Sequence, residues 1–166
     1  MTSLRYGHSL QFGISLTPRH DSADAVVALA QRSERLGYDL VTFQDHPYQP
    51  RFLDTWTLLT WVASRTQRIR VAGNVLNVPM RPPAVLARAA VSPTDTTDTT
   101  DTTATTATTA TTSTLHGPSA HWVEVLGQLA VQDGIDTFVL FSDDPRTLEQ
   151  FAEGVIPALR EVARQR

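Results

Sequence analysis

Short apolar runs and longer helical stripes follow one another along the first 91 residues. Residues 12–16, 38–44 and 69–76 are apolar runs rich in β-branched and aromatic side chains, which predicts three buried strands. After each run, apolar residues recur at helical spacing, which predicts three amphipathic helices. Strands that alternate with helices over short connections are typical of parallel sheets with right-handed crossovers.

Capping residues set the expected ends of these helices. Asp21 or Ser22 can cap the first helix, and Gly37 stands where a left-handed C-terminal residue belongs. Asp54 is placed to cap the second helix, and Pro83 can occupy the first turn of the third. The local chemistry therefore agrees with the hydrophobic periodicity.

The pattern breaks in residues 93–116, where a triplet repeat of Asp-Thr-Thr and then Ala-Thr-Thr fills most of the segment. The repeat has no large apolar residue, so it cannot offset an ordering entropy of about 1–2 kcal/mol per residue. We expect a disordered linker. A transient edge strand is the alternative, and a mucin-like glycosylated stalk would need a signal peptide that the sequence does not indicate.

The α/β pattern resumes after this linker. Residues 119–132 form an amphipathic stripe ended by Gly134, and residues 136–141 predict a fourth strand. Asp144 can cap a last helix with Pro145 at its first position, and Pro157 should kink that helix. The chain thus divides into a βαβαβα part at 1–92, the linker at 93–116 and an αβα part at 117–166.

Composition limits the classes of function. The 166 residues suit one domain, the net charge of −3 is modest, and basic residues are scattered, so we expect no nucleic-acid partner. No apolar run approaches the ~20 residues of a membrane span, so we expect no membrane partner either. Residues 1–11 lack the apolar core of a signal peptide, and cysteine is absent. These features favour a cytoplasmic protein.

The most suggestive polar residues stand at the end of the second strand, where Gln44, Asp45 and His46 precede Pro47. In α/β proteins, chemistry usually sits at the carboxyl ends of strands. The alternative is that Asp45 caps the loop and His46 is an ordinary loop residue. Gly73, inside the third strand, indicates a bulge or a close approach to the backbone by a ligand.

No metal site is expected. His20 and Asp21 are adjacent, and such a pair in a loop is more often a cap and its neighbour than a pair of ligands. The sequence also has no serine or cysteine nucleophile constellation and no phosphate loop.

Several stretches in a fixed order carry a family resemblance. They are AQRSERLGYD at 30–39, QDH at 44–46, TQRIRV at 66–71, GNVLN at 73–77, RPPAVLA at 81–87, DTFVL at 136–140 and FAEGVIPALR at 151–160. Together they resemble the luciferase-like superfamily of flavin- or deazaflavin-dependent oxidoreductases. The resemblance covers both ends of the family sequence, and the threonine repeat stands in place of its central segment. Because that segment carries cofactor-binding stretches in the family, its absence implies weak or no cofactor binding and a loss of activity.

The resemblance implies an α/β fold derived from an eight-stranded (β/α) TIM barrel, a fold that usually needs about 250 residues. Because the sequence predicts four strands, we expect a partial barrel with flanking helices. If the tail corresponds to the last barrel unit, its strand lies beside the first strand. The expected order is then fourth, first, second, third. Bare edges in such a sheet favour a homodimer or pairing with another half-barrel.

The resemblance also implies roles for the strand ends. His46 would donate a proton or orient the substrate, Asp45 would fix the tautomer of His46 or cap the loop, and Arg81 would reach a phosphate or substrate carboxylate. A solvated loop arginine is the alternative for Arg81. The residues expected to line the cofactor are Ser15, Gln44, Gly73, Asn74 and Val75.

In deazaflavin-dependent members, the position of Asn74-Val75 carries a cis peptide bond against the cofactor ring, with an ordinary trans strand as the alternative here. The implied cofactor is coenzyme F-420 (a deazaflavin) or FMN, and the implied reaction passes a hydride between it and a small organic substrate. The competing hypotheses are a non-catalytic half-barrel remnant or assembly module that pairs with another chain, and a chain without a stable fold.

Overall fold

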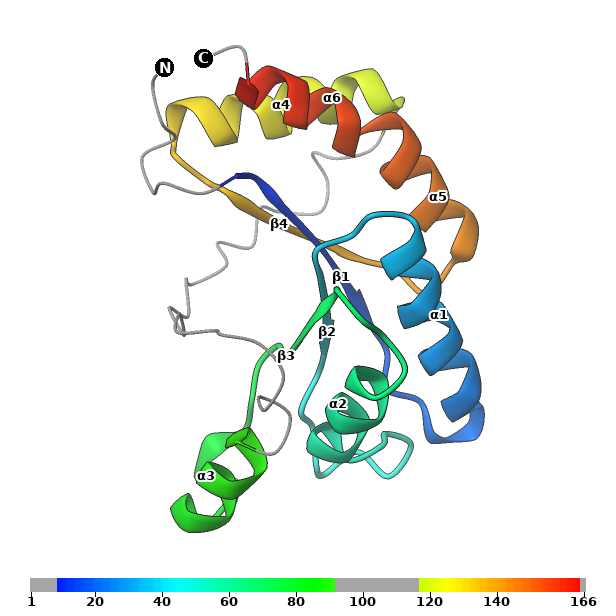
Figure 1. The fold of residues 1–166 in the computed structure, drawn as a ribbon, viewed down its shortest axis with the longest axis vertical. Coiled ribbons are helices and arrows are strands. Elements are labelled where there is room, and N and C mark those ends of the chain that lie inside the picture. The colour runs from blue at the N-terminus through cyan, green and yellow to red at the C-terminus, as the bar shows by residue number, and fades with distance from the viewer. Residues whose placement is uncertain (1–8, 92–116, 165–166) are drawn as a thin grey trace.

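A computed structural model describes residues 9–91 and 117–164 of the chain (Figure 1). The expected linker at 93–116 lies outside the described residues. The two described parts are the ones for which the sequence predicts alternating strands and helices.

One four-stranded parallel sheet joins both parts of the chain. Its strands are β1 (Gln11–Leu16), β2 (Leu40–Phe43), β3 (Arg70–Gly73) and β4 (Thr137–Phe141). The order is β3-β2-β1-β4, and all three pairings are parallel (Figure 1). The predicted strand order and the α/β class are therefore confirmed.

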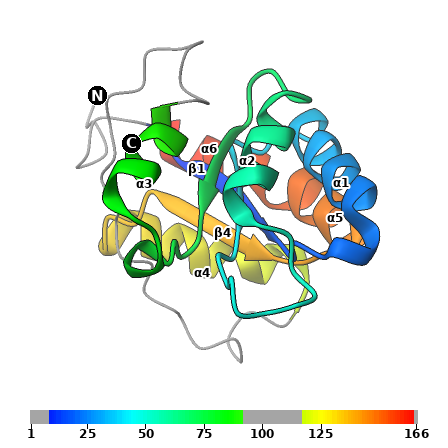
Figure 2. The ribbon, with the colours of Figure 1, turned by 90° about the horizontal axis from the view of Figure 1, so that it is seen from below.

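The helices lie mainly on one side of this sheet. They are α1 (Ala23–Arg35), α2 (Thr55–Ala63), α3 (Pro83–Val91), α4 (Ser119–Gln132), α5 (Pro145–Gly154) and α6 (Ile156–Arg164), with single 3-10 turns η1 (His20–Ser22) and η2 (Val78–Met80). Seen from below, α4, α5, α1 and α2 follow one another around the sheet, and α3 stands apart from them (Figure 2). No helix in the described ranges is both long and apolar enough to cross a membrane.

Most predicted helix ends are confirmed. The side chain of Asp54 accepts a hydrogen bond from the amide of Thr57, and Asp144 caps α5 in the same way. Gly37 and Gly134 adopt positive φ angles of 86° and 71° just after α1 and α4. Such angles suit glycine, which has no Cβ to clash with the backbone.

The cap predicted for α1 is only partly correct. Ser22 holds the N-cap position, but its hydroxyl donates to the carboxylate of Asp21 and makes no capping bond. Asp21 instead pairs with Arg19 at 2.6 Å, which lowers the pKa of the Asp21 carboxyl to about 2. Serine is a favoured capping residue, but here its hydroxyl is hydrogen-bonded to the neighbouring carboxylate of Asp21.

The kink expected at Pro157 is a break between two helices. α5 ends at Gly154 and α6 begins at Ile156, one residue before the proline. Pro157 has no amide hydrogen to give to a carbonyl in the preceding turn, and its ring crowds that turn. The two helices can therefore follow the curve of the sheet separately.

The hydrophobic core fills the space between the sheet and the helices. Alternate strand residues such as Phe12, Ile14, Val41 and Phe43 are fully buried on this face. On the opposite face, which we call the inner face, Phe141 of β4 remains 61% exposed. Within the described residues, the helix-covered face of the sheet is thus buried along β1 and β2, and the inner face is buried at Ser15 and Thr42 but exposed at Phe141.

Polar contacts fasten the tail to the first part of the chain. Arg160 of α6 donates to both carboxylate oxygens of Asp39, at 3.1 and 2.9 Å, and Asp39 also accepts the amide of Phe12. The buried hydroxyl of Tyr38 donates to the carbonyl of Leu148 at 3.0 Å, and burial raises the pKa of that phenol. The contacts of Arg160 and Tyr38 join segments more than 100 positions apart.

Candidate functional site

A row of inner-face residues crosses the sheet near the carboxyl ends of the strands. The strand registers align Ser15 with Thr42 on one side and with Phe141 on the other, and Thr42 with Ala72. Thr42 donates to the carbonyl of Ile14 at 3.4 Å. The hydroxyl of Ser15 is buried, with the residue 4% exposed, and has no hydrogen-bond partner among residues 9–91 and 117–164.

Gln44 and His46 follow β2 where the chain leaves the sheet. The carbonyl of Gln44 accepts the hydroxyl of Thr55, at 2.8 Å, which ties the strand end to the start of α2. The half-buried ring of His46 stacks with the rings of Tyr48 and Phe52, at centroid distances of 5.4 and 6.0 Å. Aromatic packing therefore holds the imidazole at the carboxyl end of the sheet.

The carboxylate of Asp45 is buried and contacts the segment after β3. It accepts the amide of Asn77 at 3.0 Å and a guanidinium N–H of Arg81 at 3.5 Å. The amide of Asp45 donates to the carbonyl of Val75, at 3.3 Å. Asp45 thus braces the loop between β3 and α3, and its partners lie there rather than on His46.

Arg81 lies between two carboxylates. Its guanidinium donates to Asp54 at 2.6 Å as well as to Asp45, and it stands 5.9 Å from the ring centroid of Trp56. Burial lowers the pKa of Arg81, but the two carboxylates outweigh burial, so the net shift is upward. For Asp54 the directions are reversed: burial raises the pKa of the carboxyl, but hydrogen bonds from Arg81 and Thr57 outweigh burial and lower the net pKa.

The side chain of Arg81 is only 21% exposed, so it does not match the alternative of a solvated loop arginine. An anion would have to compete with the two carboxylates for the guanidinium.

Gly73, Asn74 and Val75 form the exit from β3. The peptide bond between Asn74 and Val75 is cis, the geometry that the family resemblance implies, and the side chain of Val75 is exposed. A Cβ at Gly73 would lie 2.0 Å from a methyl carbon of Leu76. The close approach that the sequence indicated at Gly73 is therefore made by the Leu76 side chain.

Comparison with known proteins identifies the family. The model of the family described as luciferase-like monooxygenase matches residues 4–93. The chain belongs to this luciferase-like family. It is also similar to the structure of the coenzyme F-420-dependent tetrahydromethanopterin reductase from Methanopyrus kandleri, with 24% sequence identity and a TM-score of 0.45. That match covers 49% of this chain and 22% of the reductase chain. No curated protein matches this chain.

The structure brings most of the predicted site residues of this luciferase-like chain together at the carboxyl ends of the strands. Ser15, Gln44, Asp45 and His46 lie at the carboxyl ends of β1 and β2, and the segment 73–75 lies beside them at the end of β3. No cluster of three or more metal-ligating side chains occurs within residues 9–91 and 117–164.

Sequence reasoning missed Thr42 and the link between Asp54 and Arg81. Thr42 shares a strand face with Gln44 because side chains alternate along a strand, so the period of two could have identified it. No comparable signal links Asp54 to Arg81, which are 27 positions apart.

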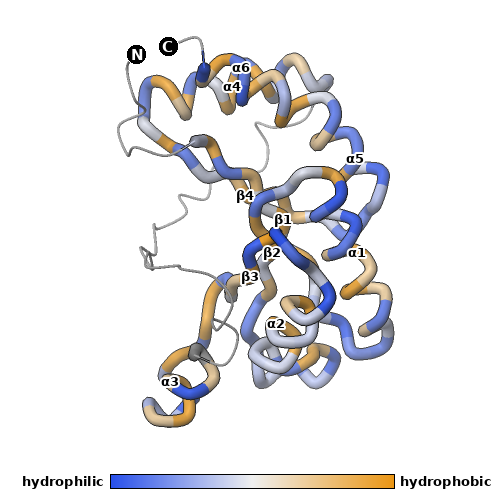
Figure 3. The backbone as a smooth tube through the Cα atoms, viewed as in Figure 1, coloured by the Kyte–Doolittle hydropathy of each residue, from blue (hydrophilic) through white to orange (hydrophobic). Residues whose placement is uncertain are grey.

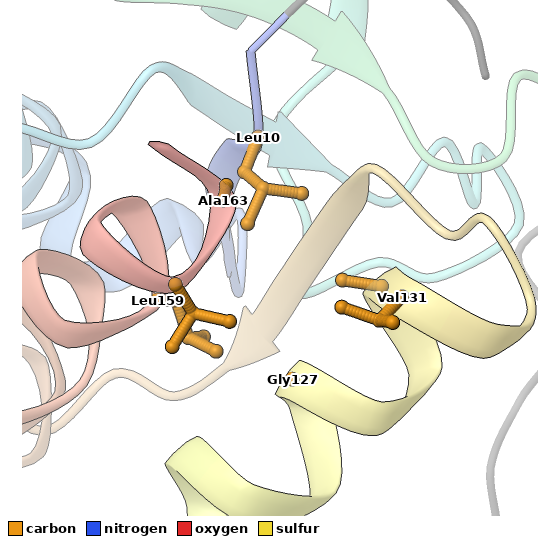
Figure 4. A pocket seen from close by; sticks show the side chains of 7 residues that line it. Leu10, Gly127, Val131, Leu159 and Ala163 are labelled. Atoms are coloured by element: carbon orange, nitrogen blue, oxygen red, sulfur yellow. The ribbon is translucent and has the colours of Figure 1, made fainter. Parts of the chain in front are cut away.

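A small apolar cavity lies at the other end of the luciferase-like sheet. It has a volume of about 20 Å³ and lies between α4, α6 and the residue before β1 (Figure 4). Its lining comprises Leu10, Gly127, Ala130, Val131, Leu159, Val162 and Ala163. The space suits about one water molecule and offers no polar partner, so it is a packing gap.

Proposed function

We propose that this chain is an oxidoreductase that binds coenzyme F-420 or FMN at the carboxyl ends of β1, β2 and β3. Membership of the luciferase-like family supports this class of reaction. The observation that carries the proposal is the buried Ser15 hydroxyl, which has no partner in the part of the chain that the structure describes. Buried hydroxyls are almost always hydrogen-bonded, so this one fits a ligand with a polar edge on the inner face.

The residues around Ser15 have distinct parts in this proposal. Ser15 would donate to the ligand, and Gln44 would contact its edge from the end of β2. The Gly73 to Val75 segment would form one wall, because it lies next to the end of β2 through the bond from the amide of Asn74 to the carbonyl of Phe43. When bound, the cofactor supplies the hydride chemistry, and the protein supplies position and electrostatics.

His46 would act on a small organic substrate. Imidazole can give or take a proton near neutral pH, and stacking between Tyr48 and Phe52 fixes the plane of the ring. Asp45 would act indirectly, because its carboxylate holds the loop at Asn77. Arg81 would complete that brace, and an anionic group could reach it only by displacing one of its carboxylate partners.

A second candidate function is a non-catalytic assembly module that pairs with another chain. The exposed Phe141 side chain beside the edge of β4 that is unpaired in the described residues favours it, since an open sheet edge can pair with a strand of another chain. Both candidates allow a homodimer or a pairing with another half-barrel. They differ in whether a cofactor binds.

A titration distinguishes the two candidates. The purified chain is titrated separately with FMN and with coenzyme F-420, and fluorescence and particle mass are followed together. We expect saturable binding, with Ser15→Ala weakening it about 5-fold to 10-fold because a hydrogen bond contributes roughly 1 kcal/mol.

Ser33→Ala is the matched control, because Ser33 is also buried but donates to a carbonyl within α1. A folded chain that binds neither cofactor would support the assembly module. Equal weakening by both variants would show that the ligand does not contact Ser15.

A further inference from the structure

The free edge of β3 is ready to pair with another parallel strand. The amides of Arg70 and Asn74 donate to carbonyls of the β2 segment, at 3.0 and 2.8 Å. Peptide groups alternate in direction along a strand, so those of Val71 and Gly73 point away from β2. In the described residues no strand pairs with this edge.

The free edge of β4 has the same polarity. The amide of Gln11 donates to the carbonyl of Asp136 at 2.7 Å, which directs the peptide groups of Asp136, Phe138 and Leu140 to β1. The peptide groups of Thr137 and Val139 then face outward. Because all four strands are parallel, the edges at β3 and β4 are two ends of one arc that run in the same direction.

Apolar surface accompanies these edges. Phe141 is exposed on the inner face beside the β4 edge, and Val78, Met80 and Val85 are exposed in η2 and α3 beyond β3. The connection after β3 and much of α3 have hydrophobic colouring and lie apart from the other helices (Figure 3). Exposed apolar side chains next to unpaired strand edges are typical of a surface that binds another chain.

We propose that a second copy of this chain closes the sheet into an eight-stranded barrel. Its twofold axis runs along the barrel axis, and β3 of each copy pairs in parallel with β4 of the other. Two arcs of four strands make eight, the number at which side chains just fill a barrel interior. The dimer then contains two β3–β4 pairings between copies, which we call seams. Both seams form at once, so no unpaired edge remains to recruit a third copy.

Charges at the amino ends of the two edge strands favour this arrangement. Arg70 is exposed at the first position of β3 and Arg68 just before it, and Asp133 and Asp136 lie in the connection that leads into β4. In a parallel seam the two amino ends meet, so opposite charges face each other at both seams. The partner's α4, which precedes β4, also gives the apolar side of α3 a surface to pack against.

The proposal is tested first by the mass of the full chain in solution. Sedimentation equilibrium should give twice the 18.3 kDa of one chain. Phe141→Asp should shift the particle toward 18.3 kDa, because a charge would enter the closed interior. Tyr48→Asp is the control: Tyr48 is 64% exposed, close to the 61% of Phe141, but lies in the loop after β2.

Cysteine pairing tests the seam directly and does not depend on either variant folding as a monomer. The chain has no native cysteine, so Ala72→Cys in β3 can be mixed with Thr137→Cys, Val139→Cys or Phe141→Cys in β4. We expect disulfides between unlike chains for the combination that matches the seam register, and none between two Ala72→Cys chains.

A wild-type mass of one chain, or disulfides mainly between like positions, would overturn the proposal. Neither measurement requires a cofactor. The barrel can therefore fail while the oxidoreductase assignment stands, and the reverse also holds.

Discussion

At the scale of single residues, neighbouring charges decide what the polar groups at the strand ends can do. Asp45 looked like a partner for His46 because the two are adjacent in sequence. In the structure, its buried carboxylate accepts hydrogen bonds from Asn77 and Arg81, which lie more than 30 positions away in sequence. Sequence could locate Asp45 at a strand end, but not the direction of its side chain, since that direction depends on how the loop after β3 returns.

Glu34 offers a pH-dependent test at this scale. Its carboxylate accepts the consecutive amides of Gln67, Arg68 and Ile69, at 2.8, 2.6 and 3.0 Å. Burial raises the pKa of Glu34, but these hydrogen bonds outweigh burial and lower the net value. Stability from this group is therefore complete above the unfolded pKa of about 4.3 and is lost as the pH falls through the lower folded value.

We expect Glu34→Gln to lower the free energy of unfolding by about 1–2 kcal/mol at neutral pH, after allowance for solvent screening. Urea denaturation at a series of pH values should show the difference from wild type shrinking below the ordinary carboxyl range. Glu153→Gln, an exposed change on α5, should have little effect throughout. If the difference in unfolding free energy between wild type and Glu34→Gln stayed constant down to acid pH, the ionised Glu34 carboxylate would not be the source of the stability.

At the scale of elements, the sequence predicted the ends of α4 better than the ends of β3. Residues 119–132 form α4 over the full predicted range. β3 was predicted over 69–76 but ends at Gly73, because the chain turns there and Leu76 folds back over the glycine. α3 was predicted correctly as a helix, but no pattern indicated that it would stand apart, since packing depends on what lies beside β3.

The turn at the end of β3 can be tested by filling the space at Gly73. Gly73→Ala places a Cβ 2.0 Å from Leu76, so we expect a loss of about 1–3 kcal/mol in the free energy of unfolding. Leu76→Ala should remove the clash, so the double variant should lose less than the sum of the single changes. Chemical denaturation of all four proteins gives the coupling.

Gly127→Ala is the matched control, because Gly127 lies inside α4 and its added Cβ would be an ordinary 3.7 Å from Leu159 of α6. That change should be neutral or stabilising, as alanine favours helices. Strict additivity of the changes at Gly73 and Leu76 would mean that the leucine does not fill the space over the glycine.

At the scale of the whole molecule, the two described parts act as one sheet because β4 completes the β1 side. The family resemblance predicted this neighbour relation from the tail sequence, and the register from Gln11 with Thr137 to Ser15 with Phe141 confirms it. The ion pair between Arg160 and Asp39 was not predictable. Arg160 belongs to a resembling stretch, but its partner depends on how α6 lies over the start of β2.

We expect Arg160→Met to lower the free energy of unfolding by about 1–2 kcal/mol, because the half-buried Asp39 loses its cation. Methionine keeps the apolar contact with the Phe12 ring, which lies 5.5 Å from the guanidinium carbon. Arg164→Met is the control, since its pair with Glu161 is on the surface at 3.7 Å. Equal midpoints of thermal unfolding for both variants would contradict a fastening role for Arg160.

The position of β4 in the sequence has a consequence during synthesis. β1 and β4 are neighbours in the sheet, but residues 17–136 separate them along the chain. Until β4 has emerged from the ribosome, β1 is an edge strand, and half of its peptide hydrogen bonds must be made with water or with another molecule. Emergence of β4 is therefore the step at which β1 changes from an edge strand to an interior strand of the sheet.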